Sequence, residues 1–395
     1  MKGKNIVVGV TGGIAAYKVA ELVRLLIKAG AQVRVAMTKS ATRFVTPLTF
    51  EALSGNKVVW DMFSQEGTSM EHITWGQESD LIIIAPATAN IIAKMAHGIA
   101  DDFLSTLVVA ATAKILVCPS MNDQMLMNPA VQDNLRILNE RNFTVMESGE
   151  GQLACHSEGP GRLPEPQEIA EHAWTLLSPQ DLSGRKLLVT AGPTVEPIDP
   201  VRYISNRSSG RMGFAMAKAA SRRGASVTLV SGPVSLTPPN GVTFIPVKTA
   251  EEMRNAVLEN RPGCDVVIKA AAVSDYKPKE SVQKKIKKGP DSLSLDLVKN
   301  PDILSELGDT KKESPCVLVG FAAETEDLLS NAEAKLKAKN LDMIVANDVS
   351  RNDAGFETDT NIVKMIFRDG HVEDSRLMTK DEVADLVLDR IISLK

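Results

Sequence analysis

One plan of secondary structure occurs twice in this 395-residue chain, and it constrains the fold more than any other feature of the sequence. The plan is a short apolar run, a glycine-containing loop, a helix-length amphipathic segment, a glycine and a second apolar run. It spans residues 5–37, beginning with NIVVGV, and recurs over residues 186–231, beginning with KLLVTA. A helix-length segment between two short buried runs predicts a parallel β-α-β unit, so the chain is expected to be α/β.

Further apolar runs follow each copy of this plan. They are LIIIAP, KILVCP and FTVMES in the first half, and DVVIKAA, CVLVGFA, LDMIVAN and NIVKMIF in the second, before a closing helix from about Lys380 to Ser393. Continuous apolar character is typical of strands buried on both faces of a parallel sheet. We therefore predict two consecutive α/β domains, residues 1–178 and 186–395, which suits a chain too long for one hydrophobic core.

Composition excludes several classes of protein. Apolar residues make up 44% and charged residues 24%, which is typical of soluble globular proteins and not of disordered chains. A net charge of −4 provides no basic field for a nucleic acid. No apolar run approaches the roughly 18 residues of a membrane span, and the run after the N-terminal lysines is too short for a signal peptide. We expect a cytoplasmic protein with no membrane or nucleic acid partner.

The four cysteines, Cys118, Cys155, Cys264 and Cys316, lie far apart and form no CxxC pair. Dispersed cysteines in a large chain without an export signal predict reduced thiols, and three of them lie in or beside apolar runs that would bury them. Cys155 differs because it lies in GQLACHSEGPGRL, which is too rich in glycine for an ordinary helix or strand. Four roles remain open for Cys155 at this point: a metal ligand, a nucleophile, a redox switch or a buried thiol.

The first loop, GVTGGIAAYK, is suited to a phosphate group. Its glycines allow close approach of the backbone, and a helix beginning after Gly13 would offer free N–H groups and its positive dipole end. The loop is not GxGxxG, and no acidic residue follows QVRVAM to bind a ribose diol, so a mononucleotide fits better than a dinucleotide. A tight turn needed only for packing is the alternative.

Polar residues also follow three predicted strands, in MTKSA, APATANIIAKMAHGIADD and CPSMNDQM. Ligands of parallel sheets bind at these carboxyl ends, and small hydroxyl and amide groups suit a neutral planar heterocycle with its phosphate. The candidates for this crevice are Thr38, Ser40, Thr88, Asn90, Ser120 and Asn122. His72, His97, Cys155 and His156 are too dispersed to predict a zinc site, and His72 alone does not distinguish a functional from an ordinary histidine.

The second half has its own candidate anion site in AGPTVEPIDPVRYISNRSSGRMG, where small hydroxyls precede a helix start at SSGRMG. The lysine-rich residues 277–289, KPKESVQKKIKKG, are expected to form a mobile loop. Their ammonium groups would either neutralise a triphosphate or simply be solvated. No GxxxxGK[ST] motif occurs, so a P-loop is excluded.

These motifs, with His72, PATANIIAKMAHGIADD, PSMNDQM and GQLACHSEGPGRL, resemble the homo-oligomeric flavin-containing cysteine decarboxylases, and the second half resembles phosphopantothenate-cysteine ligases. The fused order is similar to the bacterial bifunctional enzymes of coenzyme A biosynthesis that combine both activities. The resemblance covers essentially the whole chain. It implies two Rossmann-like domains, flavodoxin-like in the first half, and synthesis of 4'-phosphopantetheine from 4'-phosphopantothenate, cysteine and CTP.

For the first half the resemblance implies FMN-dependent decarboxylation of phosphopantothenoylcysteine. Oxidation of the substrate thiol to a thioaldehyde-like species provides the electron sink that lets carbon dioxide leave. His72 is then the base, Asn122 holds the carboxylate, and Cys155 protonates the enethiolate during its reduction. The implied FMN contacts are Gly12, Gly13, Thr38, Ser40, Thr88, Ala89, Asn90 and Ser120. A homo-oligomer built on trimers, up to a dodecamer, with the active site at a subunit boundary, is also implied.

For the second half it implies that CTP activates phosphopantothenate as an acyl cytidylate before the cysteine amine displaces CMP. Asn206 then contacts the acyl intermediate and Lys285 the triphosphate. The implied CTP contacts are Ala271, Asp275, Lys285, Asn300, Pro301, Asp302, Ile303, Phe321, Lys335 and Lys339. Lys335 and Lys339 are four residues apart and share a helix face. Mg²⁺ is expected with the triphosphate, with Asp275 as its candidate ligand.

Two residues depart from the patterns of these families. His156 stands where the decarboxylases have glycine, and Arg211 stands where the ligases have lysine, which keeps the charge but changes the hydrogen-bond geometry. A flavin- and nucleotide-binding regulatory protein without turnover would need the crevices but not the chemical residues. A decarboxylase of peptidyl cysteine would leave the second half unexplained.

Overall fold

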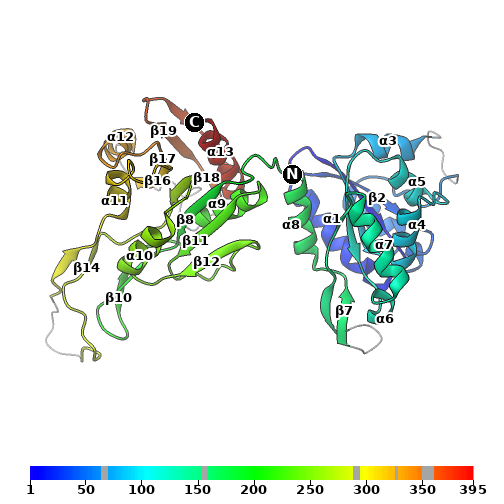
Figure 1. The fold of residues 1–395 in the computed structure, drawn as a ribbon, viewed down its shortest axis with the longest axis horizontal. Coiled ribbons are helices and arrows are strands. Elements are labelled where there is room, and N and C mark those ends of the chain that lie inside the picture. Colours follow the sequence, from blue (N-terminus) through cyan, green and yellow to red (C-terminus); the bar gives the residue numbers. More distant parts are fainter. Residues whose placement is uncertain (64–69, 153–157, 288–293, 325–327, 349–359, 395) are drawn as a thin grey trace. The chain divides into compact units, whose positions relative to one another are not determined.

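The computed structural model describes residues 1–63, 70–152, 158–287, 294–324, 328–348 and 360–394. The chain forms two compact units, Met1–Ser178 and Pro179–Lys395. Each unit is an α/β fold with helices on both faces of a sheet, as the alternation of apolar runs and amphipathic segments predicts (Figure 1). No helix within the described ranges is long and apolar enough to cross a membrane.

The sheet of the first unit is parallel and has the strand order β2-β1-β3-β4-β5. Its strands are β1 (Asn5–Val10), β2 (Gln32–Met37), β3 (Leu81–Ala87), β4 (Lys114–Pro119) and β5 (Thr144–Val145). Its helices are α1 (Val19–Lys28), α2 (Pro47–Ser54), α3 (Glu71–Glu78), α4 (Ala89–His97), α5 (Phe103–Ala110), α6 (Asp123–Leu126), α7 (Pro129–Glu140) and α8 (Pro166–Leu177). The order reverses between β1 and β3, which confirms the flavodoxin-like arrangement and marks the edge where such sheets bind ligands.

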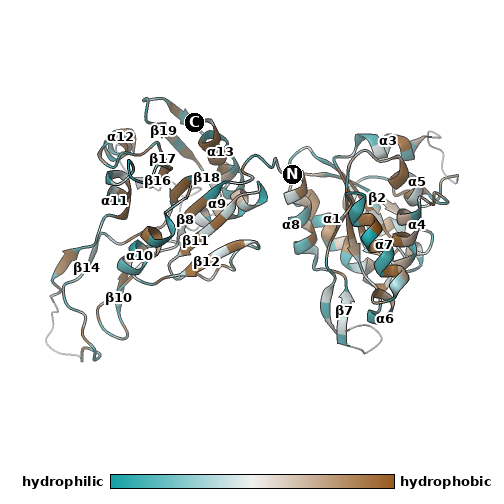
Figure 2. Cartoon of the chain, viewed as in Figure 1, coloured by the Kyte–Doolittle hydropathy of each residue, from teal (hydrophilic) through white to brown (hydrophobic). Residues whose placement is uncertain are grey.

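Helices α1, α2 and α8 pack on one face of this sheet, and α3, α4, α5 and α7 pack on the other. Every residue of β3 is buried, as its continuous apolar run requires between two helix layers. The helices carry hydrophobic and hydrophilic bands, visible for α7 in Figure 2. Helix α5 begins at a capping box, in which the Asp102 carboxylate accepts the Ser105 N–H at 2.8 Å.

Two local predictions for the first unit are wrong. After Gly13 the chain first forms a 3-10 turn, η1 (Ile14–Lys18), so the glycine loop does not lead directly into an α-helix. The glycine-rich stretch predicted to be neither helix nor strand contains parts of an antiparallel hairpin, β6 (Gly149–Gln152) and β7 (Glu158–Arg162). Glycine permits these irregular strands because Gly151 and Gly161 have φ angles of 132° and 127°.

The second unit is built on a sheet with the strand order β12-β11-β8-β13-β16-β17-β19-β20, in which the β17–β19 and β19–β20 pairs are antiparallel and the other pairs are parallel. Its strands are β8 (Lys186–Ala191), β11 (Ser226–Ser231), β12 (Val242–Pro246), β13 (Val266–Lys269), β16 (Val317–Glu324), β17 (Met343–Asp348), β19 (Val363–Phe367) and β20 (Val372–Asp374). The parallel strands follow the Rossmann order, whose switch point lies between β8 and β13.

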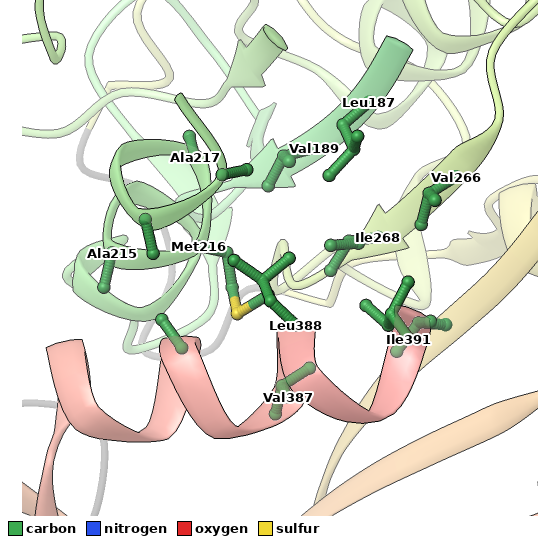
Figure 3. Packing of buried hydrophobic residues seen from close by; sticks show 14 of the residues in the cluster. Leu187, Val189, Ala215, Met216, Ala217, Val266, Ile268, Val387, Leu388 and Ile391 are labelled. Carbon is green, nitrogen blue, oxygen red and sulfur yellow. The ribbon is translucent and has the colours of Figure 1, made fainter. Parts of the chain in front are cut away.

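Helices α9 (Arg211–Arg222) and α13 (Lys380–Ser393) cover one face of this sheet, and α10 (Ala250–Asn260), α11 (Ile303–Asp309) and α12 (Leu328–Ala338) cover the other. Figure 3 shows Met216 of α9 and Leu388 of α13 gathered with Val189 of β8 and Ile268 of β13 in one apolar core. The closing helix α13 has the bounds expected from the sequence.

Short antiparallel pairs of strands lie outside this sheet. They are β9 (Val195–Pro197) with β10 (Tyr203–Ser205), β14 (Tyr276–Pro278) with β15 (Leu297–Lys299), and β18 (Thr360–Asn361) with β21 (Met378–Thr379). Figure 1 shows β10 and β14 extending away from the layers of the unit. The lysine-rich segment predicted as a loop therefore begins within β14. Farther along it, Val282 donates its N–H to the Ile198 carbonyl oxygen at 3.1 Å.

Candidate active sites

Two adjoining cavities lie at the carboxyl ends of the strands in the first unit. Their volumes are about 420 Å³ and about 610 Å³, and they share Gly12, Thr88, Ala89 and Met125 in their walls. Gly13, Ser120 and Asn122 line the smaller one, and the larger one is lined by Thr38, Ser40 and Asn90. All eight residues predicted as FMN contacts, and Asn122, thus lie around these two cavities.

Hydrogen bonds join the loops that form this crevice. The Thr11 hydroxyl after β1 donates to the Pro86 carbonyl oxygen at 2.6 Å and accepts the Thr88 N–H at 3.2 Å. The Thr38 N–H after β2 donates to the carbonyl oxygen of Val10 at 3.0 Å. The loops after β1, β2 and β3 therefore hold one another, and the cavity walls are largely preformed.

Gly12, in the loop after β1, lies in close contact with Ser40 in the loop after β2. A Cβ atom on Gly12 would lie 2.5 Å from the Cβ atom of Ser40, so a side chain would force the two loops apart. The glycine is required by this close contact, which agrees with a role in forming the ligand cradle. The neighbouring Gly13 is less constrained, since a Cβ atom there would come no closer than 3.6 Å to Thr88.

Asn122 caps the short helix α6. Its Oδ1 accepts the Gln124 N–H at 2.9 Å, which fixes the orientation of the side chain. The β6–β7 hairpin is attached to the same segment, because the Met121 N–H donates to the Gly161 carbonyl oxygen at 2.9 Å. Gly161 and Asn122 line one cavity. Cys155 and His156 lie between the two hairpin strands, outside the described residues.

His72 is placed differently from the other predicted decarboxylase residues. It lies on α3, and within the described part of the chain it is absent from the walls of both cavities. Its ring meets the ring of Phe103 edge-on, with centroids 6.5 Å apart, and Phe103 lines the larger cavity. His72 thus contacts a residue of the cavity wall without lining the cavity itself.

The second unit has a cavity of about 140 Å³ at the carboxyl ends of β13, β16 and β17. Ser208, Ser209 and Gly210 line it where α9 begins, facing Ala271 and Phe321. A helix N-terminus with small hydroxyls beside it suits an anionic group. The structure thus brings Ala271 and Phe321, two predicted CTP contacts, to the SSGRMG segment.

Asn206 joins this loop to the end of β13. Its Nδ2 donates to the carbonyl oxygens of Ala272 and Val273, at 3.3 Å and 3.1 Å. These carbonyls lie in the AAAVSDY segment, between the predicted CTP contacts Ala271 and Asp275. Asn206 is therefore well placed to fix the geometry of this segment.

A second group of predicted CTP contacts surrounds the start of α11. Asp302 forms an ion pair with Lys339 at 2.8 Å, and the Lys339 N–H donates to the Lys335 carbonyl oxygen at 3.0 Å, so both lysines lie on one helical turn. The Asn300 N–H donates to the Asp275 carbonyl oxygen at 2.8 Å. Pro301 lies in the same turn. The side chain of Ile303 is buried in the core, so only its backbone is left to contact a ligand.

Lys285 is exposed, but the chain beside it is anchored. The Ile286 N–H donates to Oδ2 of Asp199 at 3.2 Å, and the Asp199 carboxylate forms an ion pair with Arg202 at 2.6 Å. The Arg202 guanidinium, with backbone N–H groups, holds the pKa of Asp199 well below its usual range although burial opposes this. The β9–β10 loop thus positions the base of the segment that carries Lys285.

The described part of the chain brings no three His, Cys, Asp or Glu side chains together as a metal site. Asp275 is exposed. Mg²⁺ in nucleotide sites is commonly held by one or two carboxylates together with phosphate oxygens, so a single carboxylate fits an ion that arrives with a triphosphate.

Comparison with known proteins decides the family. Residues 1–178 match the family model described as Flavoprotein, and residues 182–394 match the one described as DNA/pantothenate metabolism flavoprotein C-terminal domain. The chain is 48% identical over 399 residues to the Coenzyme A biosynthesis bifunctional protein CoaBC of Bacillus subtilis (100% of this chain, 98% of that protein). It is 46% identical over 398 residues to the CoaBC of Escherichia coli K12 (100% and 98%).

The chain belongs to the CoaBC family. A crystal structure of the C-terminal domain of a CoaBC protein also matches it, with 43% identity and a TM-score of 0.47 over 54% of this chain and 97% of that domain. The Flavoprotein match covers the unit that holds the two adjoining cavities. Their small hydroxyl and amide groups and the close contact at Gly12 fit FMN, which these residues would hold.

Several residues of these CoaBC-family cavities were missed from the sequence. Lys94 lines the larger cavity and forms ion pairs with Asp101 and Asp102 at 2.6 Å and 2.8 Å. All three lie within the motif APATANIIAKMAHGIADD, whose acidic end was not assigned. Lys380 and Asn361 line the cavity of the second unit. The sequence around Lys380 indicates only the start of a helix, so only the three-dimensional structure reveals that Lys380 lines this cavity.

Proposed function

We propose that this CoaBC-family chain makes 4'-phosphopantetheine in two steps. Residues 186–395 join cysteine to 4'-phosphopantothenate at the expense of CTP, and residues 1–178 decarboxylate the phosphopantothenoylcysteine with FMN. The observation that supports this division is that each unit has its own cavity at the carboxyl ends of its strands, within one chain that matches CoaBC proteins along its length. A cytoplasmic location is part of this proposal, since it suits a metabolic role of this kind.

In the decarboxylase half, bound FMN supplies reversible two-electron oxidation of the substrate thiol. Asn122 is proposed to hold the substrate carboxylate, because it lines the smaller cavity and its side chain is fixed by the Gln124 N–H. His72 accepts a proton from the substrate, and Cys155 returns one to the enethiolate after carbon dioxide has left.

A homo-oligomer built on trimers is part of this proposal. Ile14, Tyr17 and Met125 line the smaller cavity and are 62%, 62% and 49% exposed. Large apolar side chains exposed together at a cavity commonly mark a surface that another molecule covers. A site at a subunit boundary would also account for His72, which does not line the cavities of its own unit.

In the ligase half, the carboxylate of phosphopantothenate attacks the α-phosphorus of CTP, and pyrophosphate leaves with Mg²⁺. The cysteine amine then attacks the acyl carbon, loses a proton and displaces CMP. Lys285 is proposed to neutralise charge on the triphosphate, and the start of α9 to bind an anionic group. Asn206 is proposed to contact the acyl intermediate, since its amide is fixed against the AAAVSDY segment.

A single incubation tests both activities. The purified flavin-containing protein is mixed with phosphopantothenate, cysteine, Mg²⁺ and either CTP or ATP, and pyrophosphate and carbon dioxide are followed together. We expect equal amounts of both products with CTP. The absence of both products from protein that retains bound flavin would overturn the proposal.

Two matched variants test whether the activities belong to separate units. Asn122→Ala should leave pyrophosphate formation intact and suppress release of carbon dioxide. Asn206→Ala removes two hydrogen bonds of about 1 kcal/mol each, so ligation should fall by roughly 30-fold while supplied phosphopantothenoylcysteine is decarboxylated normally. Loss of both activities in either correctly folded variant would contradict the division.

A further inference from the structure

Lys269 is the last residue of β13, beside the switch point of the second sheet. Alternate residues of a strand face opposite sides, and Val266 and Ile268 pack in the core under α9 and α13. Val267 packs in the core under α10, α11 and α12. Lys269, two residues farther on, faces the same side as Val267. Its side chain is therefore directed toward the layer that holds the Asn300–Ile303 turn.

Four charged groups from neighbouring segments act on the Lys269 ammonium. They are Lys335 in the last turn of α12, Lys339 just after it, Asp302 at the N-cap of α11, and Asp275 in the segment after β13. Lys339 and Asp302 form an ion pair at 2.8 Å. Within the ranges that the structure describes, no residue forms a hydrogen bond or ion pair with the Lys269 ammonium. This cluster thus contains a lysine without a partner.

The environment of Lys269 opposes its positive charge. Burial, together with the Lys339 ammonium, lowers the pKa of Lys269 to about 8, although Asp302 and Asp275 act in the opposite direction. A partly buried ammonium without a hydrogen-bond partner destabilises a fold. Such an arrangement is commonly found where a ligand supplies the missing partner.

We propose that Lys269 is a further nucleotide-binding residue of the ligase site, with its ammonium donating to an acceptor oxygen or nitrogen of CTP. This inference rests on the proposed ligase function. The residue lies immediately before the AAAVSDY segment and among the predicted contacts Asp275, Asp302, Lys335 and Lys339. A bound nucleotide would stabilise the charged form, so binding above pH 8 would take up a proton.

The test is the pH dependence of KM for CTP in the full-length flavin-containing protein, between about pH 7 and 9.5. In the wild type, KM should be nearly constant below pH 8 and then rise, approaching about tenfold per pH unit. Lys269→Met should have a KM at least about tenfold higher at pH 7 and should lack the rise. Lys269→Arg should keep a low KM to higher pH, because arginine stays charged.

Lys337→Met provides a matched control, because Lys337 is an exposed lysine on α12. It should follow the wild-type profile. Binding of CMP and of CTP is measured for each variant. If the variant binds CMP and CTP with equally reduced affinity, the contact is to the cytidine monophosphate moiety. If only the affinity for CTP is reduced, the contact is to the outer phosphates. Both outcomes support the proposal.

An active wild type with a folded Lys269→Met variant of unchanged KM and unchanged pH profile would overturn the role of Lys269. If the wild type itself forms no pyrophosphate, the proposed ligase function fails instead. The two failures are therefore distinguishable.

Discussion

The Met121 N–H donates a hydrogen bond to the Gly161 carbonyl oxygen at 2.9 Å, so strand β7 is in backbone contact with the segment that carries Asn122. Gly161 has a φ angle of 127°, which residues with side chains rarely adopt. A Cβ atom there would also clash with the Met121 carbonyl oxygen. The backbone conformation and the contact both require glycine, and the hairpin depends on them for its position.

Gly161→Ala should therefore displace the hairpin and uncouple it from Asn122. We expect decarboxylation of supplied phosphopantothenoylcysteine to fall by about 100-fold, since misplacement of a reacting group by about 1 Å has effects of this size. Pyrophosphate formation should be unchanged. The two products are measured on the same preparation.

Gly159→Ala is the matched control for Gly161→Ala. It lies in the same strand, but its Cβ atom would lie 3.6 Å from the nearest atom, the Cβ of Asp123, which is an ordinary contact. This variant should decarboxylate at close to the wild-type rate. If both alanine variants were equally impaired, the contact between Gly161 and Met121 would not explain the loss.

The contact of Gly12 with Ser40 predicts an effect on flavin binding. Gly12→Ala would force the loops after β1 and β2 apart, because the new Cβ atom would lie 2.5 Å from the Ser40 Cβ atom. The amount of flavin bound per polypeptide, measured by absorbance, should fall by at least about tenfold, with an unchanged far-ultraviolet circular dichroism spectrum. Gly13→Ala should reduce it less, and the reverse order would contradict the role assigned to Gly12.

The Asp199 carboxylate links the β9–β10 loop to the segment that carries Lys285, which predicts an effect on ligation. Asp199→Asn removes the ion pair with Arg202 and weakens the bond to the Ile286 N–H, so KM for CTP should rise by about tenfold. Asp374→Asn is the control, because the exposed Lys364–Asp374 pair should contribute little. Equal kinetics for the two variants would contradict the anchoring role.

The same carboxylate should make stability depend on acid pH. The pKa of Asp199 is lower in the fold than its ordinary value of about 4. Its contribution is therefore complete above that ordinary value and is lost as the pH falls through the folded pKa. The difference in free energy of unfolding between wild type and Asp199→Asn, from urea titrations, should shrink as the pH falls below about 4.

The central strands of both sheets were predictable because they are buried on both faces, and continuous apolar runs such as LIIIAPA have no other stable place. The edge strand β12 and the β14–β15 pair were not, because most of their residues are exposed or only partly buried and carry no such pattern. A local pattern of apolar residues does not indicate which other segment of the chain a strand will pair with. Gly161 lies in the glycine-rich stretch that the sequence singles out, whereas its contact with Met121 is tertiary and has no local signal.

The candidate sites were also predictable only in part. Polar residues that follow the strands could be assigned to one crevice, because the carboxyl ends of parallel strands lie at the same edge of a sheet. Lys269 escaped notice because a lysine at the end of a strand is usually solvated, and nothing local reveals that Lys339 and Asp302 surround it. The position of His72 outside the cavities was equally invisible, since it depends on how α3 packs against Phe103.

The unpartnered Lys269 also predicts a dependence of stability on alkaline pH. Its pKa is about 8 in the fold, against an ordinary value of about 10.4 in the unfolded chain. Between these values the unfolded chain binds more protons, so the free energy of unfolding should rise with pH, by roughly 3 kcal/mol at most. Below pH 8 Lys269 is protonated in both states, and the folded state bears the full cost of the buried charge.

Lys269→Met removes this cost, so the variant should be more stable than the wild type at pH 7, and the difference should shrink toward pH 9.5. Denaturant titrations without nucleotide measure this, with Lys337→Met as the control. A difference that did not change with pH would show that the Lys269 ammonium is not destabilised by its surroundings.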